Sequence, residues 1–73
     1  MPYVEIKVIK GVFDRDEKTE MIQKVTEAVV DVEGEPLRDK TFVVIDEVES
    51  GDWGIGGNVP SAGEIRSLRM AGV

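Results

Sequence analysis

Few groups in this sequence can exchange a proton near neutral pH. The 73 residues include neither histidine nor cysteine, so the commonest general base and the thiol nucleophile are both absent. The remaining candidates are a carboxylate with a raised pKa, a lysine with a lowered pKa, and the terminal amine. The terminal amine has an ordinary pKa of about 7.7–8.0 and is therefore the group closest to neutrality.

Pro2 gives this amine an unusual form. The chain opens Met-Pro-Tyr-Val, and cells generally remove an initiator methionine that precedes a small residue. Removal of Met1 would leave Pro2 with a secondary amine at the N-terminus. An apolar pocket disfavours the charged form of an amine, so its pKa would fall and it would act as a base. An ordinary strand start also explains Met-Pro, and this interpretation stays open on the dipeptide alone.

A glycine-rich stretch, Gly-Asp-Trp-Gly-Ile-Gly-Gly over residues 51–57, is the other unusual feature. Gly54 and Gly56 have the spacing that begins a dinucleotide-binding loop, but Val59 stands where the third glycine is needed. No strand–loop–helix unit follows, so we expect tight turns and a short hairpin instead. Trp53, the only tryptophan, is expected either to anchor a subunit contact or to form the wall of a pocket.

Carboxylates occur close together at two places. Asp46 and Glu47 end a predicted strand, while Asp14, Asp16 and Glu17 begin a predicted helix, so each group has a structural explanation. No loop has the spacing of a calcium-binding loop. The sequence therefore predicts no metal site.

Length and charge limit the class of protein. A chain of 73 residues makes one small domain, which buries only roughly 60% of its unfolded surface, so we expect self-association to stabilise it. The net charge of −6 argues against nucleic acid as a partner. We find no membrane-spanning apolar run and no leader of the signal-peptide type, which favours a cytoplasmic location.

Local patterns predict three main elements. Residues 3–10 alternate apolar and polar positions, which is typical of a strand. Asp14 and Glu17 have the spacing of a capping box, and an apolar stripe follows at helical spacing, so we expect a helix over residues 15–33. We expect a second strand over residues 41–48, in which the run 42–45 is apolar without alternation, and this indicates burial on both faces.

This order predicts an α+β fold, a β-α-β unit with two parallel strands and a short C-terminal hairpin. The helix can cover only one face of the sheet. The rest of the chain is too small to cover the other face, so we expect a second subunit to do so. The tail is expected to hold a short helix around residues 64–69.

These features in this order resemble the 4-oxalocrotonate tautomerase family. The matching features are Met-Pro opening a strand, the helix DEK-x-x-x-I-x-x-V-T-E-A-V, G-x-P-L, and G-x-W-G-I-G-G, over about residues 2–59. We expect a single domain over residues 1–73, in which the resemblance covers the core at 2–59, while the tail at 60–73 is longer than expected for the family. The resemblance implies a cofactor-independent isomerase that dimerises through its sheets and usually assembles as a homohexamer.

The resemblance also implies roles for individual residues. Pro2 would be the general base, and Trp53 would keep the pocket apolar. Typical members carry arginines where this chain has Val12 and Phe42, and those arginines bind the substrate carboxylate and stabilise developing enolate charge. Cations that could replace them here, from the same or a neighbouring subunit, are Lys10, Arg15, Arg38, Lys40, Arg66 and Arg69.

Two classes of function follow. The first is a tautomerase in which Pro2 transfers a proton between enol and keto forms of a small 2-hydroxy-dienoate or enol acid; a hydratase or dehalogenase is a variant of this class. The second is a catalytically reduced binding or assembly subunit of the same fold, and one half of a hetero-oligomer is a form of this class. The loss of both arginines favours the second class, whereas the retention of Met-Pro and Trp53 favours the first.

Overall fold

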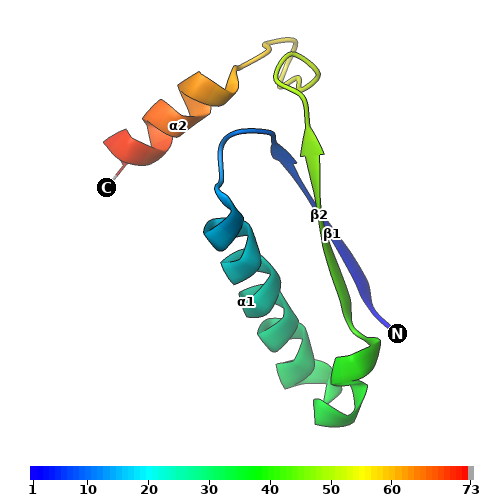
Figure 1. The fold of residues 1–73 in the computed structure, drawn as a ribbon. Coiled ribbons are helices and arrows are strands. Elements are labelled where there is room, and N and C mark those ends of the chain that lie inside the picture. Colours follow the sequence, from blue (N-terminus) through cyan, green and yellow to red (C-terminus); the bar gives the residue numbers. More distant parts are fainter. Residues whose placement is uncertain (73) are drawn as a thin grey trace.

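Two parallel strands and one long helix form the body of the protein (Figure 1). We describe residues 1–72 in a computed structural model. In chain order the elements are β1 (Tyr3–Ile9), α1 (Arg15–Glu33), a 3₁₀ helix (η1, Glu35–Lys40), β2 (Phe42–Val48) and α2 (Ala62–Ala71).

The strands pair over their full length. The register runs from Tyr3 opposite Phe42 to Ile9 opposite Val48. The backbone N–H of Phe42 also donates to the carbonyl oxygen of Pro2 at 3.0 Å, which extends the ladder by one residue at its start. Because Pro2 only accepts here, its missing N–H costs the sheet nothing. The predicted parallel β-α-β unit and the α+β class are confirmed.

Helix α1 begins and ends where its sequence indicates. The side chain of Asp14 accepts from the backbone N–H of Glu17 at 2.8 Å, and the Glu17 side chain accepts from the Asp14 N–H at 3.0 Å. This reciprocal capping box satisfies two amide groups of the first turn. At the other end Gly34 adopts a φ of 103°, which a residue with a Cβ rarely adopts, and the chain leaves the helix there. The predicted bounds, 15–33, are confirmed.

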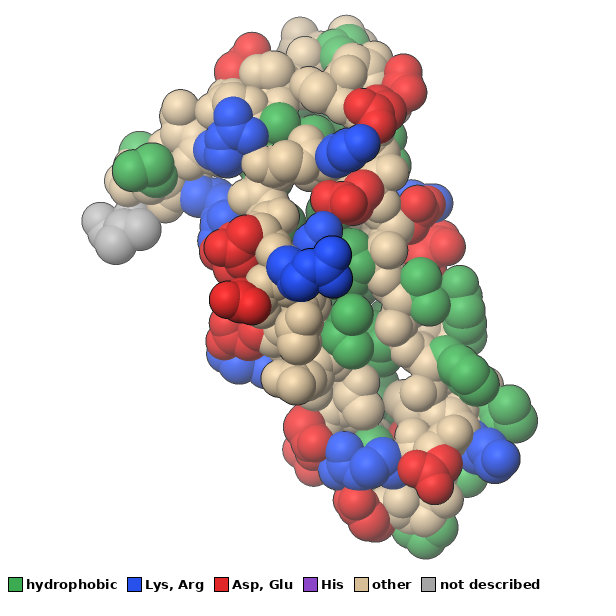
Figure 2. All heavy atoms as spheres, viewed as in Figure 1, with side chains coloured by type: hydrophobic (Ala, Val, Ile, Leu, Met, Phe, Trp, Pro, Cys, Tyr) green, Lys and Arg blue, Asp and Glu red, His purple; other side chains and the backbone are tan. Residues whose placement is uncertain are grey.

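The protein buries one side of its sheet and leaves the other open. Val8, Ile9, Val12 and Val30 form the most buried set of apolar side chains, and α1 lies against one face of the strands (Figure 1). On the opposite face Tyr3, Phe42 and Val44 remain 61%, 49% and 39% exposed. Apolar side chains project from the strands on the side away from α1 (Figure 2).

The segment after β2 has one antiparallel bridge around a hairpin-type turn, where the sequence predicted a short hairpin. Ile55 and Asn58 form a single antiparallel bridge, with N–H···O distances of 2.8 and 2.9 Å in the two directions. Gly56 and Gly57, between them, have φ angles of 58° and 86°. Positive φ at both central residues is the geometry of a two-residue hairpin turn, which explains the paired glycines.

Helix α2 confirms the predicted C-terminal helix and extends it at both ends. Ser61 caps it, because the serine hydroxyl oxygen accepts from the backbone N–H of Glu64 at 3.1 Å. The helix lies near the loop that joins β1 to α1 (Figure 1). Among residues 1–72, no helix has the length and apolar character needed to cross a membrane.

Candidate active site

Pro2 lies at the mouth of an apolar pocket. Its carbonyl oxygen is held by the N–H of Phe42, while its ring faces a pocket of about 690 Å³ between the start of β1, the second half of α1 and η1. The pocket is lined by Met1, Pro2, Ala28, Val29, Val32, Glu33 and Leu37. With Met1 attached, the Pro2 nitrogen is an amide without basicity.

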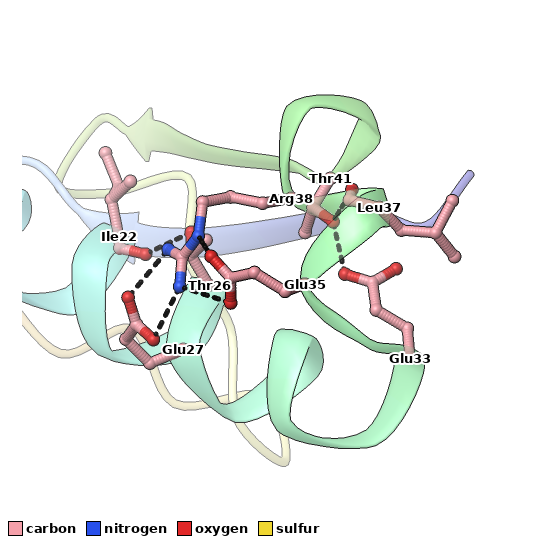
Figure 3. A network of polar contacts seen from close by, with 8 residues as sticks. All are labelled: Ile22, Thr26, Glu27, Glu33, Glu35, Leu37, Arg38 and Thr41. Atoms are coloured by element: carbon pink, nitrogen blue, oxygen red, sulfur yellow. Dashed lines mark hydrogen bonds and ion pairs between the residues drawn. The ribbon is translucent and has the colours of Figure 1, made fainter.

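Glu33 is the one ionisable side chain in this lining, and it is not among the site residues predicted from the sequence. Its Oε2 atom accepts a hydrogen bond from the hydroxyl of Thr41 (Figure 3). Its Oε1 atom is buried and has no hydrogen-bond partner among residues 1–72. The carboxylate is thus oriented by Thr41, and its second oxygen is a buried acceptor without a partner in the described residues.

A sequence signal for Glu33 does exist. An acidic residue at the last position of a helix faces the negative end of the helix dipole, which is unfavourable. The last turn of α1 contains no basic residue that would compensate. An acidic residue at the end of a helix therefore destabilises the helix more than one on its exposed side. This unfavourable placement is the sequence signal that could have singled out Glu33.

Arg38 is held by two carboxylates. Its guanidinium donates to both oxygens of Glu27 at 2.7 and 3.0 Å, and to Glu35 at 2.6 Å (Figure 3). These hydrogen bonds lower the pKa of Glu27 and of Glu35 and raise the pKa of Arg38. The interaction fixes η1 to α1. Arg38 is absent from the lining of the Pro2 pocket, and its donors are directed at these two carboxylates.

Phe42 is adjacent to Pro2 along the backbone but lies on the other face of the sheet. It is paired with Tyr3, and successive strand residues point to opposite faces. Its half-exposed ring therefore belongs to the open face, together with Tyr3 and Val44. The structure brings the backbones of Phe42 and Pro2 together and separates their side chains.

Trp53 and Val12 lie at the far end of the sheet from Pro2. Pro2 precedes β1, whereas Val12 follows β1 and Trp53 follows β2. Seven strand residues span roughly 20 Å at ~3.3 Å per residue. Trp53 is half-buried and Val12 is buried, but within one chain neither reaches the Pro2 pocket.

Two of the predicted arginines meet Val12 in a second pocket. This pocket of about 330 Å³ is lined by Val12, Arg66, Arg69 and Met70. Arg66 Nη1 donates to the carbonyl oxygen of Gly11 at 2.7 Å, and Arg69 Nη1 donates to that of Val12 at 3.0 Å. Helix α2 thus places two cations beside the residue where the family resemblance implies one.

Arg69 and Arg15 differ in how they are held. Arg69 also pairs with the carboxylate of Glu17 and lies 4.5 Å from the centroid of the Phe13 ring. Its hydrogen bond lowers the pKa of Glu17 and raises the pKa of Arg69. Arg15 is the exposed first residue of α1, and its side chain has no ion pair with a residue of the described part of the chain.

Over residues 1–72 no cluster of three or more potential metal ligands is found.

Comparisons with known proteins identify the family of this chain. A model of the family described as Tautomerase enzyme matches residues 2–63. The chain is 42% identical over 57 residues to Probable tautomerase K2 of Dickeya dadantii (strain 3937), an overlap that covers 78% of this chain and 84% of the relative.

Solved structures show the same fold. A 4-oxalocrotonate tautomerase isozyme from Methylibium petroleiphilum superposes with a TM-score of 0.71 at 34% identity, covering 88% of this chain and 97% of that one. DmpI from Helicobacter pylori superposes with a TM-score of 0.69 at 30% identity, covering 80% and 94%. The chain therefore belongs to the tautomerase family, and it is an isomerase of the tautomerase type.

Proposed function

We propose that Pro2, after removal of Met1, is the general base of a cofactor-independent tautomerase. The observation that carries this proposal is the position of Pro2, whose backbone is fixed by Phe42 while its ring faces a mainly apolar pocket. Burial of the amine favours its neutral, basic form near neutral pH. No histidine or cysteine competes for this role.

The proposed reaction needs only proton transfer. The Pro2 nitrogen takes the proton from the hydroxyl group of an enol, and the oxygen lone pair forms the keto C=O bond as the C=C electrons move to carbon. The Pro2 ammonium then returns the proton to that carbon, so the amine is regenerated. Substrate and product are isomers, and the step requires neither an oxidant nor a reductant. A small 2-hydroxy-dienoate or a related enol acid has the functional groups for it.

The complete site is proposed to form between subunits. The open sheet face with Tyr3, Phe42 and Val44 offers a surface for pairing two chains, and we expect these pairs to assemble into a homohexamer. The distance along the sheet places Trp53 out of reach of Pro2 within one chain. A neighbouring subunit would therefore supply Trp53 to the Pro2 pocket, where the indole would exclude water.

Enol–keto conversion of phenylenolpyruvate and of 2-hydroxymuconate tests this function, with Pro2→Ala as the matched variant. Intact-mass measurement on the natively expressed protein first establishes whether Met1 has been removed. We expect Pro2→Ala to lower kcat about 10²- to 10⁴-fold, the usual contribution of a general base. Equal rates for both proteins would remove the proline mechanism. Native mass spectrometry of the same sample gives the subunit number and reveals any second kind of subunit.

A further inference from the structure

The pocket beside α2 combines one available guanidinium with an apolar wall. We propose that Arg66, with Val12 and Met70, binds the carboxylate of a small acid that has an apolar or unsaturated body. The binding is argued from this pocket alone. Its role in turnover rests on the proposed function, because only then is this acid the substrate.

Most Lys and Arg side chains of this protein already form ion pairs with carboxylates. Of the nine Lys and Arg residues, six have a carboxylate partner within the described part of the chain, which leaves three. The three are Arg15, Lys40 and Arg66. Of these, Arg66 lines the pocket beside Val12. It therefore supplies the pocket with a positive charge that residues 1–72 do not neutralise by an ion pair.

Arg66 is oriented by a backbone carbonyl oxygen. Its Nη1 atom donates to the carbonyl oxygen of Gly11 at 2.7 Å, which fixes the guanidinium at the pocket. This is the one hydrogen bond that we find for its side chain in residues 1–72, and a guanidinium carries five N–H donors. A Cβ atom at Gly11 would lie 3.4 Å from Nη1, so the guanidinium packs directly against the backbone of this residue. The remaining donors suit a carboxylate, which can accept two parallel hydrogen bonds.

Arg69, the other cation of the pocket, is held differently. Arg69 donates to the carboxylate of Glu17 and to the carbonyl oxygen of Val12, and it lies over the ring of Phe13. Its charge is thus paired within the chain. The pocket presents one uncompensated positive charge, and we infer a single carboxylate on the bound acid.

The apolar wall defines the rest of the ligand. Val12 and Met70 contribute apolar surface to the lining, and the pocket of about 330 Å³ has the size of a small organic molecule. An aliphatic, aromatic or conjugated chain attached to the carboxylate would contact these two side chains. The inferred substrate class is a monocarboxylic enol acid, in contrast to a dicarboxylic one, which needs a second available cation.

Binding is tested with the unreactive monocarboxylate 3-phenylpropanoate, using its neutral amide, 3-phenylpropanamide, as the matched ligand. Titration calorimetry uses the assembled Pro2→Ala protein, in which turnover cannot interfere. We expect Arg66→Gln to weaken 3-phenylpropanoate binding about 10- to 100-fold, as for loss of a hydrogen bond to a charged group. The affinity of the Arg66→Lys protein should lie between those of the unmodified and Arg66→Gln proteins, because lysine keeps the positive charge but cannot donate two parallel hydrogen bonds to a carboxylate. Lys24→Gln, which removes an exposed charge elsewhere, should bind as before.

A second measurement does not depend on a variant. NMR spectra of the Pro2→Ala protein during the same titration should show shifts at the amides of Gly11 and Val12 and at the Nε–H of Arg66. Arg66→Gln could also weaken binding by loosening α2. Whatever the variant shows, shifts confined to other parts of the protein would overturn the proposal. Equal binding of the amide and the carboxylate would also overturn it.

The outcomes separate this inference from the proposed function. Arg66-dependent binding combined with Pro2-independent tautomerisation would leave the carboxylate site standing and remove the proline mechanism. Pro2-dependent turnover with unchanged binding and unchanged KM in Arg66→Gln would remove the carboxylate site and leave the proline mechanism standing. If both hold, Arg66→Gln raises the KM for a monocarboxylic enol acid at least about tenfold, whereas Pro2→Ala acts mainly on kcat.

Discussion

Arg69 and Glu17 join helix α2 to the start of helix α1. The guanidinium of Arg69, on α2, pairs with the carboxylate of Glu17 in the first turn of α1, across 52 positions of sequence. Glu17 is at the same time the third residue of the α1 capping box. The residue that begins α1 therefore also holds α2, and the docking of α2 is coupled to the charge of Glu17.

This coupling predicts that α2 loosens in acid. The pKa of Glu17 is lowered in the folded protein, first by the hydrogen bond from Arg69 and then by the backbone N–H of Asp14. A lowered pKa in the folded state gives a contribution to stability that is present above the ordinary pKa of 4.5 and is lost as pH falls through the folded value. The protection factors of the α2 amides, which are corrected for the pH dependence of intrinsic exchange, should therefore be constant from about pH 7 to 5 and fall below about pH 4.5.

Glu17→Gln provides the matched variant for this experiment. Glutamine can keep the capping-box hydrogen bond while removing the charge. We expect faster exchange in α2 at pH 7 and little further change in acid. Glu20→Gln, which removes a carboxylate paired with the exposed Lys24, serves as the control. Equal protection of α2 at pH 7 and pH 4 in the unmodified protein would contradict the coupling.

Gly11 has a conformation that should make substitution costly. Its φ is 93°, and a Cβ atom there would lie 3.4 Å from Arg66 Nη1. Gly11→Ala should lower the free energy of unfolding by about 1–2 kcal/mol, because an L-residue is strained in this region. Gly63, on α2, has space for a Cβ atom at ordinary contact distances, so Gly63→Ala should be neutral or stabilising. Chemical denaturation of both variants measures the difference, and a stabilised Gly11→Ala protein would contradict the argument.

Elements that depend on neighbouring residues could be predicted from the sequence. The bounds of α1 follow from Asp14, Glu17 and Gly34, all of which act within a few residues of the helix ends. β1 follows from its alternation. Pro2 could be singled out because no histidine or cysteine offers a competing base. The bounds of α1 and β1 have causes that act over a short stretch of sequence, and the choice of Pro2 needs only the composition, so a single chain reveals them.

Contacts between distant segments could not be predicted. The helix α2 could be expected, but its docking against residues 11–13 depends on arginines more than 50 positions away, and no local pattern encodes that pairing. Arg38 has the appearance of an available cation in the sequence, and only folding brings Glu27 to it. Glu33 was missed because its role arises when α1 and the start of β1 line one pocket.

Glu33 should tune the protonation of Pro2 in the proposed mechanism. A carboxylate near an amine favours the ammonium form, so removing its charge should lower the pKa of the amine. Glu33→Gln keeps the shape and can still accept from Thr41. The acid limb of the pH profile of kcat/KM should therefore move to lower pH. Asp31→Asn, a change at an exposed carboxylate of α1, is the control, and an unmoved limb in Glu33→Gln would exclude this role.

The open sheet face should carry the subunit contact. Val44 is 39% exposed and lies opposite Glu5, so Val44→Lys places a charge on this face while offering it a partner within the chain. A charge buried between subunits is unfavourable, and we expect the assembly to dissociate into smaller species. Thr19→Lys, on the exposed side of α1, should leave the assembly intact. Native mass spectrometry compares the two, and an unchanged subunit number in Val44→Lys would place the contact elsewhere.

Mixed assemblies test whether Pro2 and Arg66 act on one substrate from different subunits. The two residues lie at opposite ends of the sheet, roughly 20 Å apart along the strands, so within one chain they cannot contact the same small acid. Pro2→Ala and Arg66→Gln proteins should each be impaired alone. After unfolding together in equal amounts and refolding, about a quarter of the shared sites would receive both original residues. Activity should then recover to about that fraction of the unmodified protein, whereas a site built within one subunit would show no recovery.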